Sequence, residues 1–163
     1  AVQAALTGHL VLTTVHANNV FDVFSRFTHL GIDPYALTAA LNGIWAQRLV
    51  RLICPRCARD YQPSSNELAM HGLTPDDIAD YHFKVGSGCG ECRGSGYRGR
   101  KAIAEILSLN DRLREMVATR QPVTLIKEEA RKNGTRYLRE SALSLVAHGE
   151  TTLEEIGRVT LSA

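Results

Sequence analysis

The sequence has 163 residues, 44% of them hydrophobic, and its 19 basic and 17 acidic side chains give a formal net charge of +2. This size and apolar content predict a globular protein with one medium core or two or three small ones. The near balance of charge argues against a nucleic-acid-binding surface over the whole chain, and no apolar run approaches the roughly 18 residues that cross a membrane. The chain begins at Ala1, inside an apolar pattern and without a Met, so we expect it to be part of a longer protein.

The first 53 residues have the pattern of an α/β fold. Residues 1–7 predict the end of a helix that Gly8 terminates. Residues 9–16 are β-branched and almost continuously apolar, which is typical of a strand covered on both faces in a parallel sheet. His16 stands at the carboxyl end of that strand, where open α/β sheets bind ligands. Taken alone, His16 is more simply a loop histidine without a function.

Two helices and a second strand are expected next. Apolar side chains recur at helical spacing over residues 20–30, and a glycine ends the pattern. Asp33 and Pro34 then predict the N-cap and first position of a helix that continues to Ile44. Residues 47–53 are rich in β-branched side chains and lead directly into a cysteine, so we expect a strand there.

Four cysteines form two CxxC pairs in the middle of the chain, Cys54 with Cys57 and Cys89 with Cys92. Two residues between the members of a pair let both sulfurs reach one ion, and two pairs complete a tetrahedral shell that suits Zn²⁺. We therefore predict that residues 54–92 form an inserted subdomain with a structural zinc ion. The alternatives are two disulfides, a redox-active pair, and a catalytic zinc, which four sulfur ligands would leave without a position for water.

The long stretch between the two pairs predicts its own small structure. Residues 64–67 match a capping box for a short helix to about Met70, and a second short helix is expected at Thr74. Glycines are dense between residues 86 and 99, and we expect tight turns around the second cysteine pair rather than a phosphate loop. No GxxxxGK[ST] motif occurs in the sequence, so this chain by itself is not a P-loop enzyme.

The last third of the chain predicts a strand followed by helices. Residues 102–109 have the composition of a strand. Four helices should begin near residues 110, 125, 138 and 151, and glycines at 134 and 149 end the second and third. Amphipathic helices with charges of both signs on their outer faces predict a small bundle over residues 110–163.

Several stretches recur together, in the same order and spacing, in one known family. They are residues 6–18, which end in a His box; Arg26 with residues 30–34; residues 46–51, which run into the first CxxC pair; and the second pair followed by residues 97–100. In this order they resemble the secretion ATPases that drive type II secretion and type IV pilus assembly. The resemblance covers nearly the whole chain.

The resemblance implies an α/β fold: the C-terminal part of a RecA-like ATPase core, with an inserted tetracysteine zinc subdomain and a C-terminal helical subdomain. The corresponding domains are residues 1–53, 54–92 and 93–163. Such ATPases are cytoplasmic hexamers at the inner face of the bacterial inner membrane, where they bind platform and secretion or pilus assembly proteins. The implied cofactors are structural Zn²⁺, with ATP and Mg²⁺ in the full-length parent, and neither a nucleic-acid partner nor a membrane span is implied.

The resemblance also assigns roles to two residues. His16 corresponds to the His-box residue near the γ-phosphate, and Arg100 to an arginine that lies against the nucleotide base. A histidine at a strand end and an arginine brought back by the metal subdomain could flank one nucleotide. The Walker A loop, acidic box and Walker B motif of the family would precede Ala1, so we expect the isolated chain to be inactive.

Two alternatives come from other classes of protein. Residues 89–96 match the CxxCxGxG unit of the zinc domains of DnaJ-type chaperones, which bind peptides, although that unit occurs only once here. A zinc-ribbon nucleic-acid binder is suggested by Arg93, Arg98, Arg100 and Lys101 near the second cysteine pair. Only Tyr97 interleaves with these cations as a stacking aromatic, which weakens the ribbon interpretation.

Overall fold

The computed structural model describes residues 1–160, which fall into two compact units. Unit 1 consists of residues 1–46 and 105–137, and unit 2 of residues 47–104 together with the described residues from Leu138 onward. The chain therefore passes from unit 1 into unit 2, back into unit 1, and again into unit 2. None of the helices in the described residues is long and apolar enough to cross a membrane.

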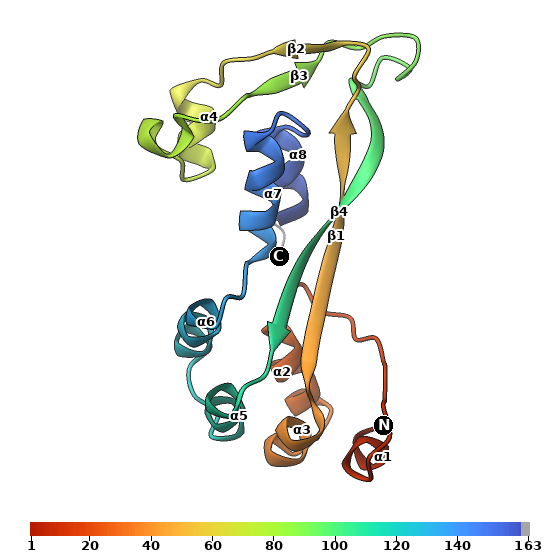
Figure 1. Ribbon diagram of the computed structural model, residues 1–163, viewed down its shortest axis with the longest axis vertical. Coiled ribbons are helices and arrows are strands. Elements are labelled where there is room, and N and C mark those ends of the chain that lie inside the picture. Colours follow the sequence, from red (N-terminus) through yellow and green to blue (C-terminus); the bar gives the residue numbers. More distant parts are fainter. Residues whose placement is uncertain (161–163) are drawn as a thin grey trace. The chain divides into compact units, whose positions relative to one another are not determined.

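Two long strands connect the units. Strand β1 (Gly43–Ile53) pairs with β4 (Tyr97–Ser108), and the two run in opposite directions (Figure 1). The strands predicted at residues 47–53 and 102–109 are confirmed, and both are longer than expected. Because β1 already begins at Gly43, the helix predicted to continue to Ile44 ends at Ala40 instead.

Unit 1 is built from helices around one hydrophobic core. These helices are α1 (Val2–Leu6), α2 (Asp22–His29), α3 (Pro34–Ala40), α5 (Asp111–Ala118) and α6 (Val123–Lys132). The buried core side chains come from α2, α3, α5, α6, the end of β4 and residues next to these elements: Val20, Phe21, Phe24, Leu37, Leu107, Leu109, Leu113, Met116, Val117, Ile126 and Ala130. The phenylalanines expected at helical spacing thus pack in a core.

Side-chain caps fix where the helices of unit 1 begin. The Asp33 carboxylate accepts the N–H of Ala36 at 2.9 Å, which confirms the predicted start of α3. The Asn110 side chain accepts the N–H of Leu113 at 2.8 Å and begins α5 in the same way. Arg114 of α5 then donates to the carbonyl of Leu41 at 2.7 Å, which ties α5 to the end of α3.

The predicted buried strand at residues 9–16 is not formed. This segment has no regular secondary structure: Val11 and Thr13 line a hollow of about 530 Å³ beside α1 and α3, whereas Leu10 and Leu12 are 86% and 88% exposed. A strand buried on both faces needs neighbouring strands for its backbone groups and covering layers for its side chains. No strand of residues 1–160 pairs with the segment, so the prediction is wrong for this chain.

Unit 2 contains the remaining elements. They are β2 (Ala58–Asp60), α4 (Ser65–Met70), the 3₁₀ helix η1 (Pro75–Ile78), β3 (Lys84–Gly86), α7 (Leu138–Ala147) and α8 (Leu153–Thr160). Strands β2 and β3 pair antiparallel with Arg59 opposite Val85, a two-stranded sheet that the sequence did not predict (Figure 1). The capping box expected at the start of α4 is present, with Ser64 and Glu67 bonded reciprocally.

The four C-terminal helices are all present, but they are divided between the units. Helices α5 and α6 belong to unit 1, whereas α7 and α8 belong to unit 2, so they do not form the single bundle expected over residues 110–163. The start of α8 also differs by one residue from the predicted capping box, because the Thr152 hydroxyl accepts the N–H of Glu155 at 3.1 Å.

Candidate metal centre and arginine pocket

The four cysteine sulfurs converge at one point of unit 2. The Sγ atoms of Cys54 and Cys89 are 3.9 Å apart, those of Cys57 and Cys92 are 3.9 Å apart, and those of Cys89 and Cys92 are 3.7 Å apart. All four ligand atoms lie within 4.8 Å of one another. The two CxxC pairs predicted to share a site are therefore brought together.

The local sequence explains how the pairs meet. Strand β1 ends at Ile53 and delivers Cys54, whose N–H donates to the carbonyl of Gly96 at 2.9 Å. A Cβ atom on Gly86 would lie 2.0 Å from the Gly96 carbonyl oxygen, so the two backbones approach too closely for any side chain there. The N–H of Ser87 donates to the carbonyl of Cys57 at 3.0 Å. Gly86 and Gly96 thus allow two backbone segments to pack closely beside the cysteines.

Backbone donors are aimed at the sulfur of Cys92. The N–H groups of Cys89 and Gly96 lie 3.2 and 3.3 Å from this Sγ atom. Burial raises the pKa of the Cys92 thiol, but these hydrogen bonds and those from the neighbouring thiols outweigh it and lower the pKa to about 6. At Cys57, burial and the neighbouring thiols raise the pKa to about 11. The hydrogen bonds to Cys92 therefore favour its thiolate form, which is the form that binds a metal ion.

The geometry fits a metal ion better than disulfides. Zinc–sulfur bonds of roughly 2.3 Å in a tetrahedron put neighbouring sulfurs about 3.8 Å apart, which is close to the separations of 3.7 and 3.9 Å found here. All four thiols are free, so the disulfide alternative does not hold in this structure. A set of four sulfurs leaves no ligand position for water, so the site suits a structural ion.

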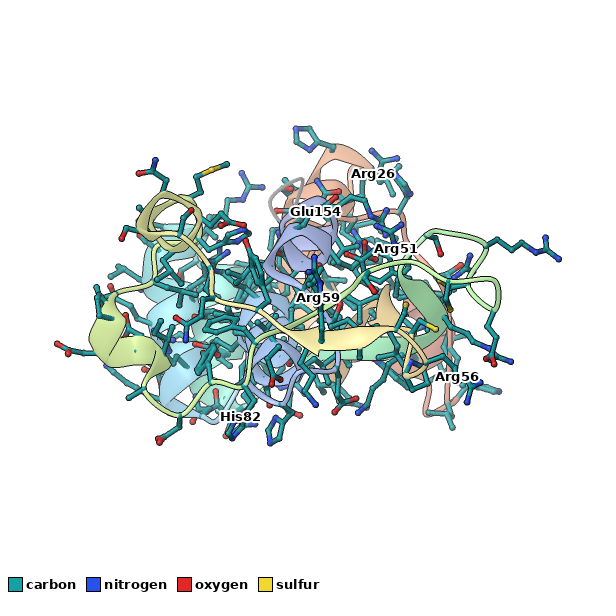
Figure 2. All side chains as sticks on the ribbon, turned by 90° about the horizontal axis from the view of Figure 1, so that it is seen from above. Arg26, Arg51, Arg56, Arg59, His82 and Glu154 are labelled. Atoms are coloured by element: carbon teal, nitrogen blue, oxygen red, sulfur yellow. The ribbon has the colours of Figure 1, made fainter. Side chains whose placement is uncertain are left out.

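A small ion-pair cluster borders the cysteines. Glu91, inside the second CxxC pair, lies 3.0 Å from the Nε atom of Arg56 and also contacts Arg98. The side chain of Arg56 reaches the surface, where it is 72% exposed (Figure 2). Part of the positive charge near the metal site is therefore balanced by Glu91, which weakens the nucleic-acid interpretation of these arginines.

His16 lies in unit 1, exposed at the end of the segment of residues 9–16. The nearby Asn19 side chain accepts the N–H groups of Phe21 and Asp22 at 2.9 and 3.0 Å and so prepares the start of α2. His9, at the other end of the segment, makes only local contacts, with its Nδ1 atom 3.2 Å from the Thr7 hydroxyl. The structure gives His16 an accessible imidazole, and its role near a phosphate stays a prediction.

Arg100 lies in unit 2, on β4, and lines an open pocket of about 480 Å³. The other residues lining this pocket are Leu49, Arg51 and Arg158. Three guanidinium groups therefore surround one hollow. The sequence predicted only Arg100 at this place.

A buried carboxylate holds two of these arginines. Glu155 of α8 is 0% exposed, and it accepts the backbone N–H of Arg51 at 2.9 Å and the Arg51 Nε at 2.8 Å. The Nε and Nη2 atoms of Arg158 donate to the same carboxylate at 2.9 and 2.7 Å. Burial raises the pKa of Glu155, but the hydrogen bonds from Arg158 and Arg51 outweigh it and lower the pKa to about 2.

Three members of this site, Arg51, Glu155 and Arg158, were not predicted from the sequence. Glu155 and Arg158 are three residues apart on an amphipathic helix, which is a visible signal for a local ion pair. Nothing in the sequence connects them with Arg51, which is more than 100 residues away. Charged residues are common on helix surfaces, where their pattern predicts a face in contact with water and not a pocket.

Comparison with known proteins identifies the family. Residues 1–158 match the family described as type II/IV secretion system protein. The chain belongs to the type II/IV secretion system protein family. Its relatives in this family include the type IV pilus assembly ATPase PilB of Thermus thermophilus, which is 40% identical over 156 residues. The alignment covers 96% of this chain and 18% of that protein.

Other members of the type II/IV secretion system protein family give a similar result. The type II secretion system protein E of Pseudomonas aeruginosa is 39% identical over 160 residues, covering 98% of this chain and 31% of that protein. The corresponding protein of Xanthomonas campestris pv. campestris is 41% identical over 167 residues, covering 29% of its length. The chain thus spans less than a third of each of these relatives, and the resemblance to secretion and pilus assembly ATPases is confirmed.

Proposed function

We propose that this chain is the C-terminal part of a hexameric cytoplasmic ATPase that powers type II secretion or type IV pilus assembly. The observation that carries this proposal is the family match over residues 1–158, with relatives named as pilus assembly ATPases and type II secretion proteins. The parent would bind ATP and Mg²⁺ and work at the inner face of the bacterial inner membrane. Its partners there would be the platform and the secretion or pilus assembly proteins.

In this proposal residues 1–53 complete a RecA-like ATPase core, residues 54–92 form a zinc subdomain, and residues 93–163 form the C-terminal helical subdomain. The zinc ion is structural, held by Cys54, Cys57, Cys89 and Cys92. Its support is the convergence of four sulfurs within 4.8 Å. Metal analysis of the purified protein should find one zinc ion per chain, and Cys89→Ser should lower that content. A metal-free native protein, or two disulfides by mass spectrometry, would overturn this part.

His16 would contact the reacting phosphate and Arg100 the nucleotide base. An imidazole near the γ-phosphate can change its contact when that group leaves, and a planar guanidinium can stack on adenine where the neighbouring lysine cannot. In the full-length parent, His16→Ala should therefore lower kcat more than it raises the nucleotide Kd. Arg100→Ala should mainly weaken nucleotide affinity, by about 1–2 kcal/mol.

Two exposed residues provide matched controls for these variants. His29 stands in the last turn of α2, and Arg112 pairs with Glu115 on α5. His29→Ala and Arg112→Ala should leave turnover and nucleotide affinity unchanged. If His16→Ala left hydrolysis and secretion intact while Arg100→Ala bound nucleotide normally, the two assigned roles would be wrong even though the family is right.

By itself the chain should hydrolyse no ATP, because the sequence contains no phosphate loop. Phosphate release above a blank that is lost in His16→Ala would contradict this expectation. Tight binding to DNA of any sequence, with a steep dependence on salt, would instead support the zinc-ribbon alternative.

A further inference from the structure

The pocket between β1, β4 and α8 has an excess of positive charge. Arg51, Arg100 and Arg158 line it together with Leu49. Glu155 is the carboxylate that pairs with two of them, Arg51 and Arg158. Within residues 1–160, no ion pair or hydrogen bond satisfies the side chain of Arg100. Three guanidinium groups therefore face one hollow against a single carboxylate, which favours an anion there.

Two of the arginines are held in fixed orientations. The buried Glu155 carboxylate accepts Nε of both Arg51 and Arg158, at 2.8 and 2.9 Å. Each of these contacts uses one edge of the planar guanidinium and so determines the direction of the opposite edge. The Glu155 carboxylate is fully buried, although the side chains of Arg51 and Arg158 remain 38% and 58% exposed, so these hydrogen bonds satisfy a carboxylate that has no contact with water.

Arg51 is held from a second side as well. Its guanidinium carbon lies 4.2 Å from the centre of the Tyr97 ring, a cation–π contact. The Tyr97 hydroxyl is 2.7 Å from the Thr152 hydroxyl, which also caps α8. The start of α8, the Tyr97 ring and the Arg51 side chain thus form one connected arrangement at the pocket wall.

We propose that this pocket binds a phosphate group, with Arg100 as its free cation and Glu155 as the positioning residue for Arg51 and Arg158. Arginine suits this ligand because its planar fork donates two parallel hydrogen bonds to phosphate oxygens. The proposal goes beyond the assignment of Arg100 to a nucleotide base and does not depend on it. The phosphate could belong to a nucleotide or be a free anion, and these sources share the recognised chemistry.

Calorimetric titration of the zinc-loaded protein at low ionic strength tests the pocket, with inorganic pyrophosphate as the probe. We expect pyrophosphate to bind and Arg100→Ala to weaken it about tenfold, because a charge-assisted hydrogen bond contributes on that order. Arg112 is an exposed arginine of unit 1, so Arg112→Ala should not change the affinity for pyrophosphate. No binding, or an equal loss in both variants, would overturn the proposal.

Two further ligands separate this proposal from the base contact. Adenosine carries no phosphate, so binding of adenosine without pyrophosphate would overturn the phosphate pocket and leave the proposed base contact intact. ADP identifies the source: ADP binding more tightly than pyrophosphate supports a nucleotide phosphate, and equal affinities support a free anion. In either supporting case, affinity should fall as salt is added.

Glu155→Gln distinguishes positioning from simple charge balance. The substitution removes a negative charge from beside the pocket, so charge alone predicts tighter binding of pyrophosphate. It also weakens the contacts that orient Arg51 and Arg158, so positioning predicts weaker binding. We expect weaker binding in a protein that still holds its metal. Tighter binding would overturn the positioning role of Glu155, and Arg100→Ala tests the pocket even if this variant fails to fold.

Discussion

Unit 1 and the cysteine region of unit 2 are stabilised by different means. Unit 1 buries a continuous cluster of apolar side chains from four of its helices and β4. Between residues 54 and 92, by contrast, the buried apolar side chains are Leu68 and two of the cysteines themselves, Cys54 and Cys92. So small a core does not offset the entropy of ordering the region. Hydrophobic burial therefore stabilises unit 1, whereas the proposed zinc ion would have to stabilise the cysteine region.

Loss of the metal should have the largest effect on stability. This effect should be confined to the cysteine region, residues 54–92. Cys89→Ser, or treatment with a chelator, should unfold residues 54–92, because metal binding free energy is folding free energy in so small a region. Hydrogen exchange measured by mass spectrometry should show loss of protection there and retained protection in α5 and α6. Equal loss of protection in both units would show that the metal stabilises the whole chain.

A cavity in the core of unit 1 should give the opposite pattern. Leu113 is 1% exposed within the cluster, so Leu113→Ala should lower the free energy of unfolding of unit 1 by about 2–5 kcal/mol. The zinc content should stay at the wild-type level. Urea denaturation followed by circular dichroism, with metal analysis of the same samples, checks both expectations. Loss of zinc in this variant would contradict the separation of the two regions.

The Glu155 network should make the stability of unit 2 depend on pH at the acidic end. The pKa of Glu155 is lowered from 4.5 to about 2 in the folded protein. The contribution of this carboxylate to the free energy of unfolding is therefore fully present above about pH 4.5 and is lost as the pH falls towards 2. Glu155→Gln should be less stable than the wild type near neutral pH, and this difference should shrink over that range.

Urea denaturation at a series of pH values measures the difference between the two proteins. Protonation of the cysteine ligands affects both proteins alike, so it largely cancels in the comparison. A difference that stays constant between pH 5 and 2.5 would show that the Glu155 carboxylate is not the group responsible.

The smallest expected effect concerns the start of α5. Asn110→Ala removes the acceptor that bonds the N–H of Leu113 and should lower the stability of unit 1 by about 1 kcal/mol. Ser64→Ala at the start of α4 is the matched change in unit 2, where the helix is short and exposed. Denaturation curves of both variants, with zinc bound, show whether a cap matters more where a core already exists.

The sequence by itself determined the features that depend on residues close together in the chain. The caps at Asp33 and Ser64 were predicted correctly, and so was the start of α5 near residue 110, because a helix start is decided by a few neighbouring side chains. The cysteine site was also predicted, since the CxxC spacing brings two sulfurs to one ion and the four cysteines together complete its shell.

Only the tertiary structure decided the features that join distant residues. The Arg51–Glu155 contact spans more than 100 residues, and neither side chain carries a sign of its partner. The division of the C-terminal helices between two units also could not be predicted from the sequence. The apolar face of an amphipathic helix can pack against more than one neighbour, and the sequence does not say which. Residues 9–16 are the converse case: their pattern is that of a buried strand, but a strand forms only where another strand supplies its hydrogen bonds.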